Sequence, residues 1–323
     1  MRRREFLTSS LATVAVAPVQ AYAQHQRRLA FLGPTLNNPP AIAQYRAFHT
    51  QLGDLGFREG KNLIVDYRAL DDPGGPYAMA AELVRSQPDL IVAAGPETSL
   101  RAVVGAAGIL PIVMIAVNFD PLALGYIRDL ARPGGNVTGL VFQQLELAQK
   151  QVELLAQTFP ERNRLALLYN AQSGDQFNAA EHAAKALNLQ VPLRLEIQPY
   201  DFDAAFRSAA SSGAQMVLVL SSPSFLPHQP RIVELANTHR LPSMFIVKHW
   251  AQAGGLMAYG ADFPLLYSRA AEYAAKMLRG AKPADLPVEQ ATKFELIVNL
   301  KTAKVIGIDL PTSILLRANE VIE

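Results

Sequence analysis

Residues 89–94 are Asp-Leu-Ile-Val-Ala-Ala and residues 112–117 are Ile-Val-Met-Ile-Ala-Val, and these two stretches decide the fold. Both are short apolar runs without the polar alternation of a strand that has one face in water. Such runs are typical of central strands in a parallel sheet that helices cover on both faces. A segment of helical period at 97–107 lies between them. The stretch therefore predicts a β-α-β unit.

The same alternation continues on both sides of this unit. Glycine, proline, asparagine and serine punctuate most of the joints, as expected for turns between strands and helices. A second series starts after the loop at Arg132–Asn136. Strands are expected at 29–32, 63–67, 165–169, 193–197, 216–220, 242–247 and 256–259, and helices at 41–55, 77–86, 145–158, 175–187, 202–211 and 262–277.

Two halves of about 110 to 120 residues are each large enough for a core of their own. We therefore predict an α/β protein with two Rossmann-like lobes, each built on a parallel sheet. Lobe 1 is expected to comprise residues 27–138 plus about 262–298, and lobe 2 residues 139–261 plus about 299–323.

The amino-terminal segment predicts export. Three arginines at positions 2–4 precede an uncharged apolar run from Phe6 to Val19, and small residues at 21–23 favour cleavage before Gln24. The arginines at positions 3 and 4 also fit the twin-arginine type of signal peptide. The run of about 14 residues is shorter than the roughly 20 that span a bilayer, which disfavours an uncleaved anchor. We predict a signal peptide over residues 1–23 and a periplasmic mature protein.

Composition limits the partners of the mature chain. The formal net charge is +2, and residues 2–5 carry all of it, so the mature chain is near neutral. No basic run suggests nucleic acid. Because the chain has no cysteine, it has neither a disulfide nor a thiol for lipid attachment. We expect a soluble, monomeric mature protein that is stabilised by its hydrophobic cores.

Common catalytic motifs are missing from the sequence. It has no phosphate-binding loop, no Gly-x-Gly-x-x-Gly after the first strand and no Gly-x-Ser-x-Gly elbow. Its six histidines include no pair spaced i, i+4 for a helical zinc site. The sequence therefore predicts no catalytic residue, no cofactor and no metal site. A carboxylate pair of Asp120 with Asp262 is the hydrolase alternative.

Short polar loops after the expected strands carry the candidate ligand-binding residues. Two facing parallel sheets place a ligand in the cleft between their carboxyl edges, where these loops meet. Free main-chain N–H groups and hydroxyls suit a carboxylate, whereas Asp120 suits an ammonium group. The candidates are Thr35, Gly95, Pro96, Thr98, Asn118, Asp120, Thr138, Asn170, Ser173, Ser221, Ser222, Trp250 and Tyr259.

Each candidate also has a structural alternative. Serine, threonine, asparagine and aspartate are the preferred residues for capping helices. Asp120 precedes Pro121, which is the arrangement of a helix start. Trp250 offers either a flat face to an apolar ligand or a large side chain to the core.

Several longer strings carry a family resemblance along nearly the whole chain. They are GFREGKN at 56–62, RPGGNVTG at 132–139, GGLMAYG at 254–260, GAKPADLPVEQ at 280–290, TKFEL at 292–296 and NLKTAK at 299–304. With these strings in this order, the chain resembles the tryptophan/tyrosine-type ABC transporter substrate-binding family. The family commonly has serines after the first strand, where this chain has Gly33 and Pro34 and only Thr35 as a hydroxyl.

The resemblance implies a type I periplasmic binding fold, in which two lobes joined by three crossings close on a ligand. Thr138, Gly139, Gly260 and Ala261 are then hinge candidates, because small residues at element ends absorb such rotations. We expect a receptor, not an enzyme, that delivers an amino acid or a related small carboxylate or aromatic compound to the permease and ATPase subunits of an ABC importer. The alternative is a periplasmic sensor subunit for a membrane receptor kinase.

Overall fold

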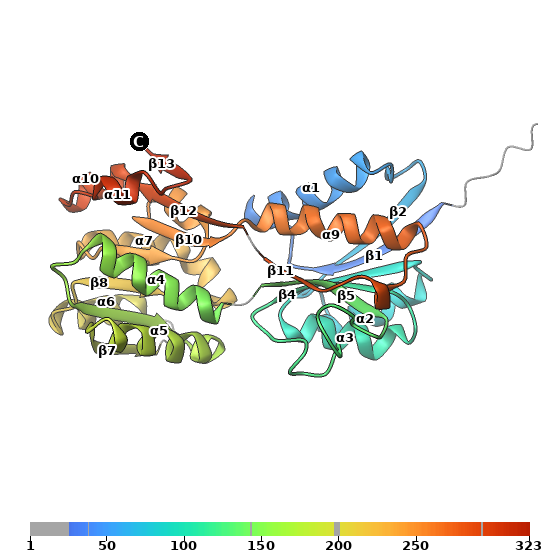
Figure 1. The fold of residues 1–323 in the computed structure, drawn as a ribbon, viewed down its shortest axis with the longest axis horizontal. Coiled ribbons are helices and arrows are strands. Elements are labelled where there is room, and N and C mark those ends of the chain that lie inside the picture. The colour runs from blue at the N-terminus through green and yellow to red at the C-terminus, as the bar shows by residue number, and fades with distance from the viewer. Residues whose placement is uncertain (1–25, 38, 143, 197–200, 292) are drawn as a thin grey trace, which may run out of the picture.

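The computed structural model describes residues 26–323 except 38, 143, 197–200 and 292. The predicted signal peptide at 1–23 lies outside the described residues. Figure 1 shows two bodies side by side, each built on its own sheet and joined at a narrow waist. No helix in the described part is long and apolar enough to cross a membrane.

The first sheet has the strand order β11-β5-β4-β3-β1-β2, and every neighbouring pair in it is parallel. Its strands alternate in the chain with helices, as the apolar runs predict. The strands are β1 (Arg27–Gly33), β2 (Leu63–Ala69), β3 (Leu90–Gly95), β4 (Ile112–Val117), β5 (Val137–Phe142) and β11 (Glu289–Gln290). The helices that pack on them are α1 (Pro39–Asp54), α2 (Gly75–Arg85), α3 (Glu97–Ala107) and α9 (Phe263–Leu278).

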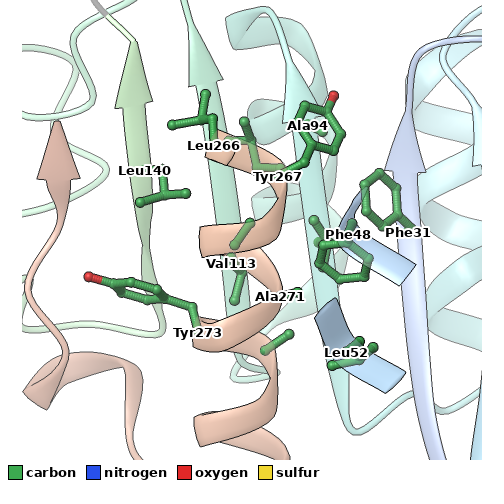
Figure 2. Close-up of a cluster of buried hydrophobic side chains, with 14 of the residues drawn as sticks. Phe31, Phe48, Leu52, Ala94, Val113, Leu140, Leu266, Tyr267, Ala271 and Tyr273 are labelled. Carbon is green, nitrogen blue, oxygen red and sulfur yellow. The ribbon is translucent and has the colours of Figure 1, made fainter. Parts of the chain in front are cut away.

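Successive residues of each strand in this sheet point to opposite hydrophobic cores. Phe31 packs with α1 and α9 on one face, whereas Leu32 packs with α2 and α3 on the other. Helix α9 therefore brings a late segment of the chain back to the first sheet. Figure 2 shows Leu266, Tyr267 and Ala271 on this helix, next to the strands that it covers. Burial on both faces explains why the strands have continuous apolar sequences.

The second sheet has the order β13-β12-β10-β9-β8-β6-β7. All neighbouring pairs in it are parallel except β10 with β12. Its strands are β6 (Arg164–Tyr169), β7 (Gln190–Glu196), β8 (Met216–Val219), β9 (Ser243–Phe245), β10 (Met257–Ala261), β12 (Phe294–Asn299) and β13 (Glu320–Ile322). Its helices are α4 (Leu145–Thr158), α5 (Gly174–Ala186), α6 (Phe202–Ser211), α7 (Gln229–Thr238), α8 (Lys248–Gln252), α10 (Leu300–Ile306) and α11 (Thr312–Leu315), with short 3-10 turns η1 (Ala171–Ser173) and η2 (Pro223–His228). A third 3-10 turn, η3 (Pro283–Asp285), packs against β5 of the first sheet.

Two segments lie in a different sheet from the one that the sequence suggested. Residues 139–142 belong to β5 and pair with β4 of the first sheet, because Leu140 and Val141 fill the two cores of that lobe. Strand β12 belongs to the second sheet, where it pairs antiparallel with β10, because Val298 and Ile297 fill the two cores there. The chain therefore passes from one lobe to the other between Phe142 and Gln144, at Asp262, and between Ala291 and Lys293.

Candidate functional site

The carboxyl edges of the two parallel sheets face the waist of the molecule. Strand β5 runs parallel to its sheet and ends at Phe142, immediately before the chain enters the second body at Gln144. Strand β10 is parallel to β9 and ends at Ala261, immediately before α9 returns to the first body. The loops that follow strand ends in both sheets therefore meet at this junction, which is where doubly wound folds bind ligands.

After β1, the chain makes a close turn that leaves one hydroxyl without a partner. The Tyr67 hydroxyl donates a hydrogen bond to the Pro34 carbonyl oxygen and its ring stacks on Phe31, with the ring centroids 5.3 Å apart. A side chain at Gly33 would meet the Phe31 ring at 2.7 Å, so a larger residue does not fit there. The Thr35 hydroxyl oxygen is buried and has no hydrogen-bond partner.

After β3, a glycine and a proline lead into α3. Gly95 has φ +125°, a conformation that favours glycine. The Pro96 carbonyl accepts a hydrogen bond from the Ser99 hydroxyl at 2.7 Å, while Thr98 is exposed on the first turn. Glu97 accepts a hydrogen bond from the Tyr126 hydroxyl. Burial, followed by this bond, raises the pKa of Tyr126 to about 12, so the phenol remains a donor at neutral pH.

After β4, Asn118 and Asp120 shape a turn at the edge of the first sheet. Asn118 has φ +66° and its main-chain N–H donates to the Phe142 carbonyl at 3.2 Å. One carboxylate oxygen of Asp120 accepts hydrogen bonds from the main-chain N–H groups of Leu122 and Ala123, at 2.8 and 3.1 Å. Asp120 therefore caps the turn, as its position before Pro121 suggested, and it is also exposed at this edge.

In the second body, the loops after β6 and β8 are joined by buried polar side chains. The Asn170 amide donates to the Ser222 hydroxyl at 2.8 Å. The Ser173 hydroxyl accepts from the Asn170 main-chain N–H at 3.1 Å, and its oxygen lies 3.2 Å from the Asn170 carbonyl oxygen. All three residues are at most 5% exposed. These hydrogen bonds fix the main chain at the carboxyl edge.

Two glutamines that the sequence did not single out complete this edge. The Gln144 amide nitrogen donates to the Ser221 hydroxyl at 3.0 Å. The Gln176 carboxamide pairs with the Ser221 main chain, since its oxygen lies 3.0 Å from the amide nitrogen and its nitrogen 3.2 Å from the carbonyl oxygen. The signal for Gln144 was its place directly after a strand, but that strand was not predicted.

The comparisons with known proteins identify the family. A family model described as ABC transporter substrate binding protein matches residues 35–322. This chain belongs to the ABC transporter substrate-binding family. The resemblance drawn from the sequence strings is thereby confirmed.

A curated relative and two solved structures are similar to this substrate-binding protein over most of its length. A tyrosine-binding protein of Clostridioides difficile is 28% identical over 276 residues, which cover 83% of this chain and 78% of the relative. A solved structure from Streptococcus pneumoniae, described as an ABC domain in complex with L-Trp, aligns with a TM-score of 0.79 at 24% identity, covering 92% of this chain and all of that one. A conserved domain protein from Vibrio cholerae aligns equally well, at 23% identity, and covers 92% of this chain and 99% of that chain.

These neighbours confirm the predicted α/β architecture, the type I periplasmic binding fold with two Rossmann-like lobes. The family is one of binding proteins that serve ABC transporters, and its members are typically extracytoplasmic. The first lobe of this substrate-binding protein holds Thr35, Gly95 and Asp120 at its carboxyl edge, and the second lobe holds Asn170 and Ser221.

Three hinge candidates of this substrate-binding protein lie inside paired strands. Thr138 and Gly139 sit in the first half of β5, and the fully buried Thr138 hydroxyl donates to the Leu286 carbonyl at 2.7 Å, which leaves it out of reach of a ligand. A Cβ on Gly139 would lie 2.1 Å from the Met114 carbonyl oxygen. Gly260 pairs with Glu295 inside β10, whereas Ala261 is the last residue of that strand.

Trp250 and Tyr259 differ in how close they come to the waist. Trp250 is 4% exposed and stacks on Phe245 with the ring centroids 4.9 Å apart, so the core alternative describes it. Tyr259 is half-buried, stacks on Phe294, and packs against cores of both lobes. The structure therefore keeps Tyr259 near the junction and places Trp250 inside the second lobe.

Two carboxyl groups lie at neighbouring crossings. Asp262 caps α9 by accepting a hydrogen bond from the Leu265 main-chain N–H at 3.0 Å. Burial, followed by the charge of Asp262, raises the pKa of Glu295 at the start of β12. Within the described residues, no group of three or more histidine, aspartate or glutamate side chains is arranged to hold a metal ion.

Proposed function

We propose that this chain is the solute receptor of an ABC importer and that it binds an amino acid between the carboxyl edges of its two sheets. The observation that carries this proposal is the convergence of hydroxyl, carboxamide and main-chain N–H groups on one junction. Thr35, Asn118 and Asp120 approach it from the first lobe, and Asn170 and Ser221 from the second. The family and the relative named as a tyrosine-binding protein support an amino acid with an aromatic side chain as the first solute to test.

Contacts from both lobes explain why a solute drives closure. Only the closed arrangement lets one solute touch both edges, so the solute has a higher affinity for that arrangement. An exposed Asp120 on the first lobe suits the ammonium group, and the main-chain N–H groups at the edge suit the carboxylate.

A binding role without catalysis fits the chemistry of the edge. The hydrolase alternative needs Asp120 and Asp262 to act as a carboxylate pair. Asp120 is engaged in capping a turn after β4 and Asp262 in capping α9. Both carboxylates therefore have structural roles, and the receptor function needs neither of them as an acid or base.

Export by the twin-arginine route is part of the proposal and rests on the sequence of residues 1–23. Replacing Arg3 and Arg4 together by lysine is expected to leave the precursor in the cytoplasm, because that pathway reads the arginine pair. Cell fractionation measures the outcome. Normal periplasmic accumulation of the double variant would mean that another export route operates.

A thermal-shift screen tests the receptor function. The chain from Gln24 onward would be heated with L-tyrosine, L-tryptophan, L-leucine, short carboxylic acids and purines. A solute at 100 times its dissociation constant stabilises the folded state by about 2.7 kcal/mol, which moves the midpoint by several degrees. The proposal fails for amino acids if none of the three raises the midpoint while a compound of another class does.

A further inference from the structure

Four buried side-chain polar atoms in the described part of the chain have no hydrogen-bond partner. They are Thr35 Oγ1, Gln144 Oε1, Asn237 Oδ1 and His249 Nε2. Thr35 and Gln144 directly follow strands that end at the junction, while Asn237 lies at the other end of its lobe, in the last turn of α7. A buried polar group without a partner is rare in folded proteins and marks a place where a ligand or water supplies one.

Gln144 is the most constrained of the four. It is 4% exposed, and its amide nitrogen donates to the Ser221 hydroxyl, whereas its carboxamide oxygen has no partner. Ser221 is in turn fixed by the Gln176 carboxamide, which accepts from the Ser221 main-chain N–H at 3.0 Å and donates to the Ser221 carbonyl at 3.2 Å. The two residues that are hydrogen-bonded in this cluster, Ser221 and Gln176, are uncharged, so neither of them offers a cation to the Gln144 oxygen.

The position of Gln144 couples it to movement between the lobes. Phe142 pairs with Val117 and belongs to the first lobe, whereas the Gln144 carbonyl accepts from Ala148 of α4 in the second. The crossing lies between these two residues. A rotation of the lobes about this crossing therefore changes what faces the Gln144 oxygen, while its contact with Ser221 stays within one lobe.

We infer that Gln144 is a ligand-binding residue, whose carboxamide oxygen accepts a hydrogen bond from the ammonium group of the solute in the closed arrangement. The inference rests on the proposed amino-acid receptor function and adds a residue that recognises the ammonium group of the solute. Ser221 is the positioning residue that orients the carboxamide. Leaving the oxygen unpaired is costly in the open arrangement, so pairing with the solute favours closure.

The test compares solutes that differ only in the amine. Calorimetry measures the dissociation constant of the protein for each member of two pairs. L-Tyrosine is compared with 3-(4-hydroxyphenyl)propionate, and L-tryptophan is compared with indole-3-propionate. Gln144→Met keeps the size of the side chain and removes the carboxamide. A hydrogen bond to a charged group corresponds to a preference of roughly 10- to 150-fold, so the preference for the amine should fall by about tenfold or more.

Two further variants keep the test decisive. Gln144→Glu retains an acceptor oxygen and is expected to retain the preference for the amine. Gln151→Met is the matched control, because Gln151 is a buried glutamine of α4, the helix that Gln144 precedes, and its amide donates to the Tyr259 carbonyl at 2.8 Å. It should lower the melting temperature without altering the preference.

The outcomes separate the inference from the function on which it rests. If the wild type binds the amino acids and Gln144→Met keeps the full amine preference, Gln144 does not read the amine, although the receptor function stands. The same conclusion holds if Gln144→Glu loses the preference as completely as Gln144→Met. If the wild type binds none of these amino acids, the proposed solute class and the inference both fail.

Discussion

Replacing Gly260 by alanine distinguishes close packing from a hinge role. A Cβ at this position would lie 1.6 Å from the Ile246 carbonyl oxygen, and real Cβ contacts stay above 3.0 Å. The end of β9 and strand β10 would therefore have to separate by roughly 1.4 Å. Overpacking in a core typically costs about 1–3 kcal/mol, and here the obstacle is main chain that cannot rotate away. We expect Gly260→Ala to lower the free energy of unfolding by about 3 kcal/mol or more.

Equilibrium unfolding in urea, followed by circular dichroism, measures this loss. The matched control is Gly105→Ala in α3, where an added Cβ meets nothing within 4 Å. That change should be neutral or stabilise the protein by up to about 1 kcal/mol, because alanine favours the helix. A Gly260→Ala protein with wild-type stability but altered solute affinity would refute the packing argument and restore the hinge role.

Three other substitutions test single contacts. Trp250→Leu should lower the free energy of unfolding by about 3 kcal/mol without changing solute affinity, because the ring is buried on Phe245. Burial lowers the pKa of His249 to about 4. The neutral imidazole therefore contributes fully to the free energy of unfolding above about pH 6.5, and this contribution is lost as the pH falls toward 4. In urea titrations, the free energy of unfolding of the wild type should fall by about 2 kcal/mol more than that of His249→Gln between pH 7 and 4.5. Asp120→Ala should cost about 1 kcal/mol through loss of its cap, and an additional loss of affinity for amines, but not for their deaminated analogues, would support the ammonium contact.

The fold follows from the sequence because burial on both faces leaves a strong pattern. Strands β3 and β4 are covered by helices on each side, so every position in them is apolar and the runs stand out. Strand β5 is equally buried, yet it follows a loop rich in glycine and includes Thr138 and Gly139. Those residues suggested a flexible crossing, whereas Gly139 is needed for close approach to Met114.

The sequence predicts which loops form the candidate site, but it does not predict which side chains in and around those loops contact one another. Residues after parallel strands were expected at the junction, and the strand order places them there. The sequence did not single out Gln144, because its place at the edge depends on β5 ending at Phe142. It did not single out Gln176 either, because this side chain reaches from the first turn of α5 to a loop 45 residues later. The role of Trp250 depends on packing against Phe245, which no spacing reveals.

The waist of the molecule is packed, and this restricts how the lobes move. The hydrophobic core of the first lobe continues through Phe142 to Leu147 of α4 and to Ile246 after β9, so one buried cluster spans the junction. Gln151 adds hydrogen bonds from α4 to the carbonyls of Phe245 and Tyr259, at 3.4 and 2.8 Å. A movement that separated these groups would expose apolar surface, whereas a rotation about the crossings would keep them buried. Closure by rotation therefore draws the Gln144 oxygen and the loops of the first lobe toward one solute, and the affinity of the receptor includes the free energy of that rotation.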